Sequence, residues 1–266
     1  TKYYCFYKVI ADGVIGCSYV SSYSDFAVHL NGERVVTKAS IDWLDLPTNT
    51  SWSTWALKKA IMFGDSLVSA QLNDSTEGGG YCRRLKEHLM LTDCVNEGRS
   101  GRPIADGTPN GAGTVSTVLS VTNYSTYDLV IIAGGTNDFK LNVPIGSLSA
   151  IGSTFDRTTF YGALQTIFEY LMSKKANIRT CMWTPLQRNN DGYDINTTNS
   201  AGHKLSDYCD AIKEVGKLYS VPVVDMYTIS GVNMLNLSWY TADGLHLNGQ
   251  GYDVVSYIGA KQVNTL

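Results

Sequence analysis

From residue 59 onward, short apolar segments alternate with longer segments of helical length and spacing. The apolar segments cover 60–63, 94–96, 129–133, 178–183 and 221–225, and the helical ones cover 81–91, 114–121, 159–173, 204–218 and 252–263. Strands that alternate with helices imply a parallel sheet, covered by helices on both faces and joined by right-handed crossovers. We therefore expect an α/β domain over residues 59–266, with its active site at the carboxyl ends of the strands.

Residues 1–58 have a different character. Short β-prone runs follow one another, and Asn31-Gly32 joins two of them, at 27–30 and 33–36. Asn-Gly between such runs is a strong hairpin signal. We expect a small β-rich N-terminal appendage that is too short to bury a sound core alone. It either packs on the following domain or is the end of a larger upstream structural domain. The chain begins at Thr1 rather than Met, so we expect a processed product or a piece of a longer protein.

Composition excludes several classes of partner. The 266 residues carry a formal net charge of -3, with lysine and arginine dispersed, which gives no footprint for nucleic acid or an anionic membrane. No apolar run approaches the roughly 20 residues needed to span a bilayer.

The six cysteines lie far apart without a C-x-x-C pair, and we expect buried free thiols. The four histidines show no metal-ligand spacing, so we predict neither a metal nor a cofactor.

Ser66 is the candidate nucleophile. It stands in Gly64-Asp65-Ser66-Leu67, directly after the first strand of the domain, which places its hydroxyl at the carboxyl edge of the sheet. Taken alone, a serine at this place is more often a helix cap. The α/β-hydrolase elbow G-x-S-x-G is a poor match, because Val68 stands where its final glycine belongs.

Asp243 and His246 are the candidate acid and base. Their three-residue spacing can bring a carboxylate against an imidazole, so that Asp243 sets the tautomer and orientation of His246. An Asp-x-x-His pair is a weak signal by itself. The alternative is a surface loop followed by a helix cap, since Asn248 and Gly249 look like the start of the last helix.

Gly98 and Asn137 are the candidate oxyanion donors. Gly98 ends Asn96-Glu97-Gly98 and offers a backbone N–H that a substrate can approach closely, while Asn137 offers a side-chain amide after Gly134-Gly135. Singly, each has a plain structural alternative, an ordinary turn for Gly98 and an Asx turn for Asn137. Neither alternative explains why both follow strands of one sheet.

Together, the segments that hold these residues resemble the SGNH, or GDSL, hydrolases, a family of serine esterases named after four residues: here Ser66, Gly98, Asn137 and His246. The resemblance covers residues 60–266 approximately and implies a flavodoxin-like three-layer α/β/α fold. It implies that Ser66 attacks the acyl carbon and that His246, oriented by Asp243, acts first as base and then as acid.

The same resemblance implies an oxyanion hole made of the Ser66 and Gly98 amides and the Asn137 side chain. It also implies that Asp65 braces the serine loop rather than acting in chemistry. The N-terminal appendage lies outside the family pattern and is similar to additions on phage-tail or secreted carbohydrate-active esterases. We therefore expect an extracellular or virion-associated protein.

Two tryptophans are candidate substrate-binding residues. Trp183 ends a strand at the expected active-site edge and Trp239 shortly precedes Asp243, so either could stack on a sugar ring; alternatively, Trp183 belongs to the core and Trp239 anchors the loop. We expect removal of a small acyl group, such as acetyl, from an acylated carbohydrate. The alternatives are a lysophospholipase or thioesterase acting on longer acyl chains, or a non-catalytic glycan-binding adhesin module. A homo-oligomer is a further expectation.

Overall fold

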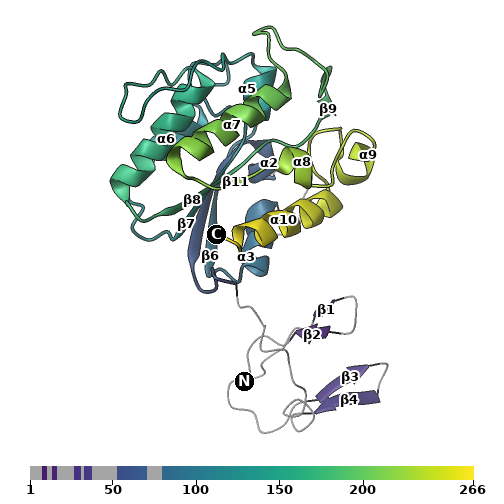
Figure 1. Cartoon of the computed structure of the whole chain (residues 1–266). Helices are drawn as coiled ribbons and strands as arrows, with labels where there is room; N and C mark the ends of the chain where they lie inside the picture. Colours follow the sequence, from purple (N-terminus) through teal and green to yellow (C-terminus); the bar gives the residue numbers. More distant parts are fainter. Residues whose placement is uncertain (1–7, 11–13, 17–26, 31–32, 38–52, 71–79) are drawn as a thin grey trace. The chain divides into compact units, whose positions relative to one another are not determined.

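The computed structural model describes residues 8–10, 14–16, 27–30, 33–37, 53–70 and 80–266 (Figure 1). The chain divides into two compact units, Thr1–Ser51 and Trp52–Leu266. The boundary expected from the sequence lay at residues 58 and 59. Trp55 belongs to the second unit because its side chain is buried in that core and its Nε1 donates to Val263 O at 2.8 Å.

The described residues of the first unit form two antiparallel strand pairs. β1 (Lys8–Ile10) pairs with β2 (Val14–Gly16), and β3 (Ala27–Leu30) pairs with β4 (Glu33–Thr37). Leu30 lies opposite Glu33, so only Asn31 and Gly32, which fall outside the described residues, connect the second pair. These pairings agree with the hairpin expected there.

The second unit is built on a five-stranded sheet. Its strands are β5 (Lys59–Gly64), β6 (Asp93–Gly98), β7 (Leu129–Ala133), β8 (Arg179–Trp183) and β11 (Val223–Val224). The spatial order is β6-β5-β7-β8-β11, and every neighbouring pair is parallel. In chain order this is 2-1-3-4-5, the flavodoxin-like order, whose switch point lies between the first and third strands. The expected fold class is confirmed.

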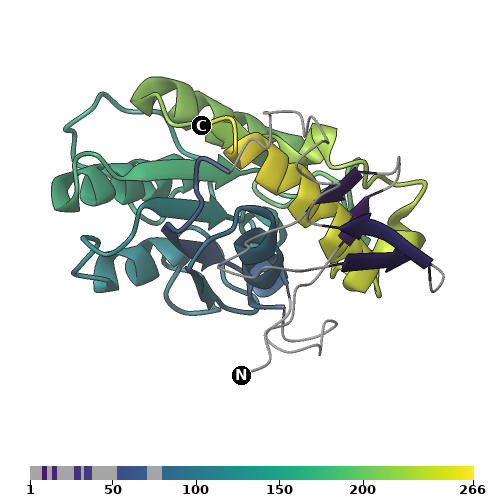
Figure 2. The ribbon, with the colours of Figure 1, turned by 90° about the horizontal axis from the view of Figure 1, so that it is seen from below.

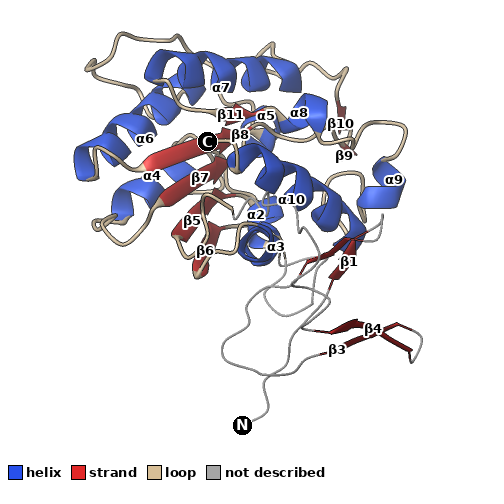
Figure 3. Cartoon of the chain, turned by 60° about the horizontal axis from the view of Figure 1, so that its bottom comes forward, coloured by secondary structure: helices blue, strands red, loops and turns tan. Residues whose placement is uncertain are grey.

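Helices cover both faces of the sheet (Figures 1 and 2). Figure 3 shows the strands between α6 (Phe160–Lys174) and α7 (Leu205–Tyr219) on one side and α3 (Tyr81–His88) and α10 (Gly249–Val263) on the other. The helix α4 (Thr114–Ser120) packs against α6.

Alternation along the strands divides the core into two apolar clusters. In β5, Ile61 and Phe63 belong to the cluster under α4, α6 and α7, whereas Ala60 and Met62 belong to the cluster under α3 and α10. Successive side chains of a strand point to opposite faces, so a strand that is buried on both faces must be apolar throughout. This is why the sheet strands read as continuous apolar runs.

Several short elements follow the carboxyl ends of the strands. The helix α2 (Ser66–Ser69) follows β5, α5 (Thr136–Lys140) follows β7, and α8 (Met226–Ile229) follows β11. A small hairpin of β9 (Asn189–Asn190) and β10 (Tyr193–Asp194) follows β8, and α9 (Leu237–Tyr240) precedes α10. These elements are too short for a periodic pattern to reveal, and they form the edge on which the candidate site lies.

None of the helices in the described parts of the chain combines the length and the apolar character that a membrane span needs.

Candidate active site

Ser66 is the first residue of α2, immediately after β5 ends at Gly64. The preceding residue, Asp65, is the N-cap of this short helix, and its Oδ1 accepts from the Leu67 N–H at 2.9 Å. Side chains that cap a helix satisfy N–H groups that have no partner within the helix. Asp65 therefore holds the turn that presents the Ser66 hydroxyl, and Ser66 itself is 7% exposed.

Ser66, His246 and Asp243 form a continuous hydrogen-bonded chain. Ser66 Oγ lies 2.9 Å from His246 Nε2, and His246 Nδ1 lies 2.7 Å from Asp243 Oδ2. With the Nδ1 proton donated to the carboxylate, Nε2 is left to accept the proton of the serine hydroxyl. The structure thus brings together three residues that span 180 positions of sequence, in the order that nucleophilic catalysis requires.

The loop that carries Asp243 and His246 is itself well held. The second carboxylate oxygen, Asp243 Oδ1, accepts from the backbone N–H groups of Leu245, at 3.0 Å, and His246, at 2.8 Å. Partial burial alone raises the pKa of the Asp243 carboxyl, but the hydrogen bonds from the His246 side chain and from these two amides outweigh it and lower that pKa. Asp243 is therefore ionised beside the imidazole at neutral pH.

Asn248 serves two purposes in the same region. Its Oδ1 accepts from Gly251 N–H at 2.9 Å and caps α10, as its sequence position suggested. Its Nδ2 donates to Trp239 O at 2.9 Å, which ties the loop to α9. The helix cap and the Asp243–His246 pair are thus consecutive parts of one segment rather than competing interpretations.

Asn137 lies in α5 at the end of β7, beside the switch point of the sheet. Its side chain is buried, and its Nδ2 donates one proton to Arg102 O at 3.1 Å. A primary amide carries two N–H donors, so the second remains for an oxyanion. The next residue, Asp138, accepts from Ile104 N–H at 2.7 Å and Ala105 N–H at 3.0 Å, which holds the loop after β6 against α5.

Gly98 ends β6 and lies directly beside the serine turn. A Cβ atom added at Gly98 would lie 2.4 Å from Ser69 N and 2.7 Å from Val68 Cβ, so only glycine permits this approach. In this structure, the Gly98 N–H donates to Asn96 Oδ1 at 2.9 Å, while Asn96 Nδ2 donates to Val68 O at 2.8 Å. An oxyanion would have to share the Gly98 N–H with Asn96 Oδ1 or displace Asn96 Oδ1 from it. The donor role of Gly98 therefore stays a prediction.

Two buried carboxyls lie beneath these loops. Burial raises the pKa of Asp65 to about 6, against which the Leu67 N–H and the charges of His246 and Arg188 act. Burial likewise raises the pKa of Asp138 to about 7, although it accepts two backbone N–H groups. The active-site loops therefore rest on carboxyls that lose their protons less readily than in water.

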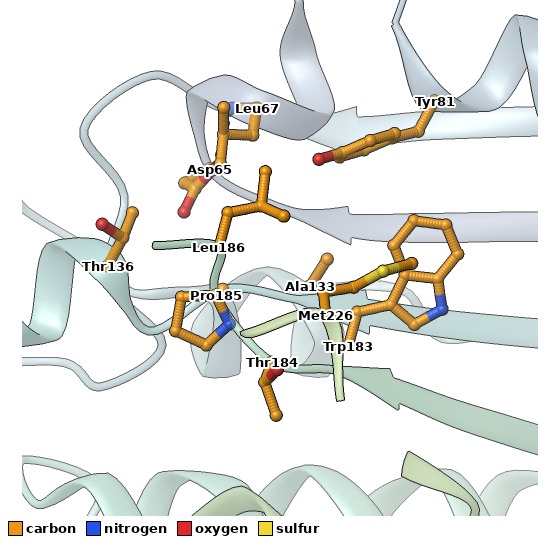
Figure 4. A pocket seen from close by; sticks show the side chains of 11 residues that line it. Asp65, Leu67, Tyr81, Ala133, Thr136, Trp183, Thr184, Pro185, Leu186 and Met226 are labelled. Carbon is orange, nitrogen blue, oxygen red and sulfur yellow. Dashed lines mark hydrogen bonds between the residues drawn. The ribbon is translucent and has the colours of Figure 1, made fainter. Parts of the chain in front are cut away.

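A small cavity of about 20 Å³ lies beneath the serine turn (Figure 4). Both sequence neighbours of Ser66, Asp65 and Leu67, line it, together with Tyr81, Ala133, Gly134, Thr136, Trp183, Thr184, Pro185, Leu186 and Met226. Figure 4 shows the Tyr81 hydroxyl pointing toward Leu186 and Asp65. A space of this size exceeds the roughly 10–15 Å³ that one water molecule needs.

The two tryptophans occupy very different environments. Trp183 is 1% exposed and packs edge-on against Tyr81, with ring centroids 5.2 Å apart. Neither of its ring faces is open to a sugar in this structure, and it contributes to the cavity wall instead. Trp239, in α9, is 72% exposed, and its role in substrate binding stays a prediction.

Sequence reasoning missed Arg188, which is fully buried between β8 and β9. Its guanidinium contacts Thr136, the neighbour of Asn137, and Asn190, whose side chain reaches the Asp243 loop. The available signal was an arginine soon after a strand, at the edge of the sheet where the other site residues lie. That signal alone does not distinguish a buried arginine from a surface one.

Two of the cysteines in the described part of the chain, Cys82 and Cys94, lie side by side, and their hydrogen bond is the main cause that raises the pKa of the Cys82 thiol. Cys82, Cys94, Cys181 and Cys209 are free thiols, three of them buried, and Cys5 and Cys17 lie outside the described residues. Burial raises the pKa of the Cys181 thiol to about 12. Within the described ranges, no group of three or more His, Cys, Asp or Glu side chains is placed to share a metal ion.

Solved structures similar to this chain show the same fold. One is 26% identical, with a TM-score of 0.70, over 80% of this chain and 98% of its own. A protein from Lactobacillus plantarum is 22% identical, with a TM-score of 0.67, over 79% and 98%. A protein described as a possible lipase from Chitinophaga pinensis is 19% identical, with a TM-score of 0.61, over 78% and 98%. No curated protein matches the sequence.

Residues 62–254 match the family described as GDSL-like Lipase/Acylhydrolase. The match begins within β5, ahead of Ser66, and ends within α10, beyond His246. It therefore includes all four segments from which the site is built. The chain belongs to the GDSL-like lipase/acylhydrolase family, which consists of carboxylic ester hydrolases.

Proposed function

We propose that this hydrolase removes small acyl groups, in the first place O-acetyl groups, from a carbohydrate, with Ser66 as its nucleophile. The observation that carries the catalytic part is the chain of contacts from Ser66 Oγ to His246 and on to Asp243, at 2.9 and 2.7 Å. A serine is a weak nucleophile unless an oriented base takes its proton, and this arrangement supplies that base.

In the first half-reaction, His246 Nε2 takes the proton of the Ser66 hydroxyl as Oγ attacks the acyl carbon. The tetrahedral intermediate collapses, His246 returns the proton to the departing sugar oxygen, and the sugar leaves as an alcohol. Asp243 stays ionised throughout and stabilises the imidazolium that forms between these two steps.

In the second half-reaction, His246 takes a proton from water, whose oxygen attacks the acyl-serine. The second tetrahedral intermediate expels Ser66 Oγ, which regains its proton from His246, and the free carboxylic acid leaves. Each intermediate carries a negative oxygen. The Asn137 amide and the backbone N–H groups of Ser66 and Gly98 are the donors that we assign to it, and loss of one such donor typically costs about 3 kcal/mol.

The cavity beneath the serine turn does not define the acyl site, because Ser66, Gly98, Asn137 and His246 are not among the residues that line it. The small-acyl part of the proposal is supported by the sequence, which contains no long apolar segment that could serve as the lid of a lipase. The rates on esters of increasing chain length test it directly.

The carbohydrate part of the proposal is supported by Trp239. Its side chain is largely exposed, on the short helix that precedes the Asp243 loop, and the Asn248 contact to its carbonyl fixes this helix to the segment that carries His246. Exposed aromatic rings of this kind stack on the apolar faces of sugars.

Initial rates on p-nitrophenyl esters from acetate to decanoate test the acyl preference, with Ser66→Ala as the matched control. We expect activity on acetate, a steep decline with chain length, and no activity above background in Ser66→Ala. A maximum at longer chains would replace the small-acyl proposal with a lysophospholipase or thioesterase.

Covalent labelling by a fluorophosphonate tests the nucleophile independently of the natural ester. Wild type should be labelled on Ser66 and Ser66→Ala should not. Equal labelling of both proteins would show that another residue reacts. For the carbohydrate, acetate release from acetylated polysaccharides should fall in Trp239→Ala while p-nitrophenyl acetate hydrolysis is unchanged; an equal loss on both substrates would contradict the stacking role.

A further inference from the structure

Arg188 is a buried cation whose hydrogen bonds go to neutral partners. Its side chain is fully buried, and no carboxylate among the described residues lies within 4.0 Å of it. Its Nε is buried without a hydrogen-bond partner, and its guanidinium lies 5.9 Å from the centre of the Tyr193 ring. Burying a charge in this way is costly, and an apolar side chain often serves stability as well or better. Fold stability alone therefore does not account for an arginine here.

One arm of the guanidinium holds the loop that carries the proposed oxyanion donor. Arg188 Nη1 donates to Thr136 Oγ1 at 2.8 Å and to Thr136 O at 3.3 Å. Thr136 is the first residue of α5 and the immediate neighbour of Asn137. Both contacts fix the start of the short helix on which the Asn137 amide stands.

The other arm holds the segment behind the proposed acid and base. Arg188 Nη2 donates to Asn190 O at 3.2 Å and contacts Asn190 Oδ1 at 3.4 Å. Asn190 Nδ2 then donates to the backbone oxygen of Asp243 at 3.0 Å. One residue earlier, Asn189 N–H donates to Gly244 O at 2.8 Å, so β9 supports this loop at two consecutive positions.

Three carboxylates act on Arg188, and two of them belong to the serine turn and the Asp243 loop. Burial lowers the pKa of its guanidinium, and the carboxylates of Asp191, Asp65 and Asp243 act in the opposite direction. Asp191 is itself engaged by Lys140 of α5. The cation thus lies among carboxylates of the serine turn, the β9–β10 connection and the Asp243 loop without forming an ion pair with any of them.

We infer that Arg188 is a positioning residue that sets the distance between the Asn137 oxyanion donor and the Asp243–His246 pair. The inference rests on the roles proposed for those three residues. The planar guanidinium can hold both loops at once because its two Nη groups diverge in fixed directions, which the single nitrogen of lysine cannot reproduce.

This role has a direct kinetic consequence. The oxyanion donor and the base must meet the same tetrahedral intermediate, so their separation must match it, and a displacement of about 1 Å can cost on the order of 100-fold in rate. Substrate binding before the intermediate forms depends less on that separation. Loss of Arg188 should therefore reduce kcat more than it changes KM.

Arg188→Met, which removes the charge and both arms but keeps an unbranched apolar stem, is the main test, with p-nitrophenyl acetate as substrate. The exposed Arg179, at the start of β8, provides the matched control Arg179→Met. We expect Arg188→Met to lower kcat by roughly 10- to 100-fold with little change in KM. Arg188→Lys should recover part of the loss, and Arg179→Met should behave as wild type.

A double-mutant cycle with Asn137→Ala separates positioning from a general loss of structure. If Arg188 acts through Asn137, its replacement should cost at least about threefold less in kcat when Asn137 is already alanine. A full, undiminished effect in that background would overturn the inference. So would an Arg188→Met enzyme with wild-type kcat.

Asn190→Ala cuts the Asp243 arm while Arg188 stays in place with its contacts to Thr136 and to the Asn190 backbone oxygen, so this variant tests the inference even if Arg188→Met does not fold. It should lower kcat with KM little changed, while the exposed Asn177→Ala should not. Wild-type kcat in Asn190→Ala would refute the coupling. If Asn137→Ala alone were fully active, the proposed oxyanion role of Asn137 would fail. If Asn137→Ala were impaired but the effect of Arg188→Met were undiminished in that background, the oxyanion role would stand and only the positioning role of Arg188 would fail.

Discussion

Replacing Asp65 by asparagine should stabilise the protein at neutral pH. The carboxyl is buried beneath the serine turn, and this burial raises its pKa to about 6 from an ordinary value of 3.8. Asparagine retains an oxygen that can accept the Leu67 N–H, and it is as good an N-cap as aspartate. The substitution therefore removes the buried charge while keeping the hydrogen bond that forms the turn.

The magnitude follows from the two pKa values. At low pH the Asp65 carboxyl is protonated in both the folded and the unfolded protein, so its burial costs no free energy of folding. As pH rises above the unfolded pKa and through the folded pKa, the carboxyl must ionise in the folded protein as well, and the folded state loses stability. Each tenfold difference in proton affinity is worth about 1.4 kcal/mol, so ionised Asp65 costs about 3 kcal/mol of folding free energy at pH 8. At pH 3 the cost is close to zero.

Thermal and urea unfolding of wild type and Asp65→Asn from pH 3 to pH 8 test this reasoning. The variant should gain on wild type as pH rises through about 6, with a Tm advantage of roughly 6–12 °C at the upper end. Asp156→Asn is the control of opposite sign, because hydrogen bonds from the Thr158 side chain and backbone lower the pKa of that carboxyl. A difference between Asp65→Asn and wild type that did not vary with pH would refute the argument.

Three further predictions concern the site and its surroundings. Gly98→Ala should destabilise the protein by about 1–3 kcal/mol and lower kcat, because its Cβ would lie 2.4 Å from Ser69 N; unchanged unfolding and kinetics would contradict the close approach. His246→Ala should reduce hydrolysis of p-nitrophenyl acetate to background, because it removes the base that takes the Ser66 proton, and a kcat close to that of wild type would show that another group acts as base. Removal of residues 1–51 should leave hydrolysis of p-nitrophenyl acetate intact, since Trp52–Leu266 is a compact unit with its own core; a folded but inactive product would assign the first unit a part in the pocket.

The fold could be predicted from the sequence because its strands are buried on both faces. Val130, Ile131 and Ile132 form part of an uninterrupted apolar run, which only a covered sheet can bury, and the helices between such runs show their own period. The ends of every predicted strand lie within one or two residues of the observed ends, including β11, where two residues of the expected five are paired. Short elements such as α5 and β9 lack the length for any period to show.

The site was predictable where residue type and loop position together determine the chemistry. Ser66 and His246 lie where strands or late loops reach one sheet edge, so their meeting follows from topology. Arg188 escaped prediction because its burial depends on how β9 and α5 pack, which no local pattern encodes. The occupied N–H of Gly98 is likewise a property of the folded turn, since it depends on the orientation of the Asn96 side chain.

The contact between Trp55 and Val263 has a consequence for how this hydrolase can be built into larger proteins. Together with the Thr54 N–H bond to Asn264 Oδ1 at 3.0 Å, it places the entry and exit of the unit side by side, at the amino ends of the strands. Ser66 lies at the carboxyl ends. A neighbouring module could therefore be fused at either end, or the unit inserted into a loop of a host protein, without obstructing the catalytic edge, and a short linker joining the two ends would allow circular permutation.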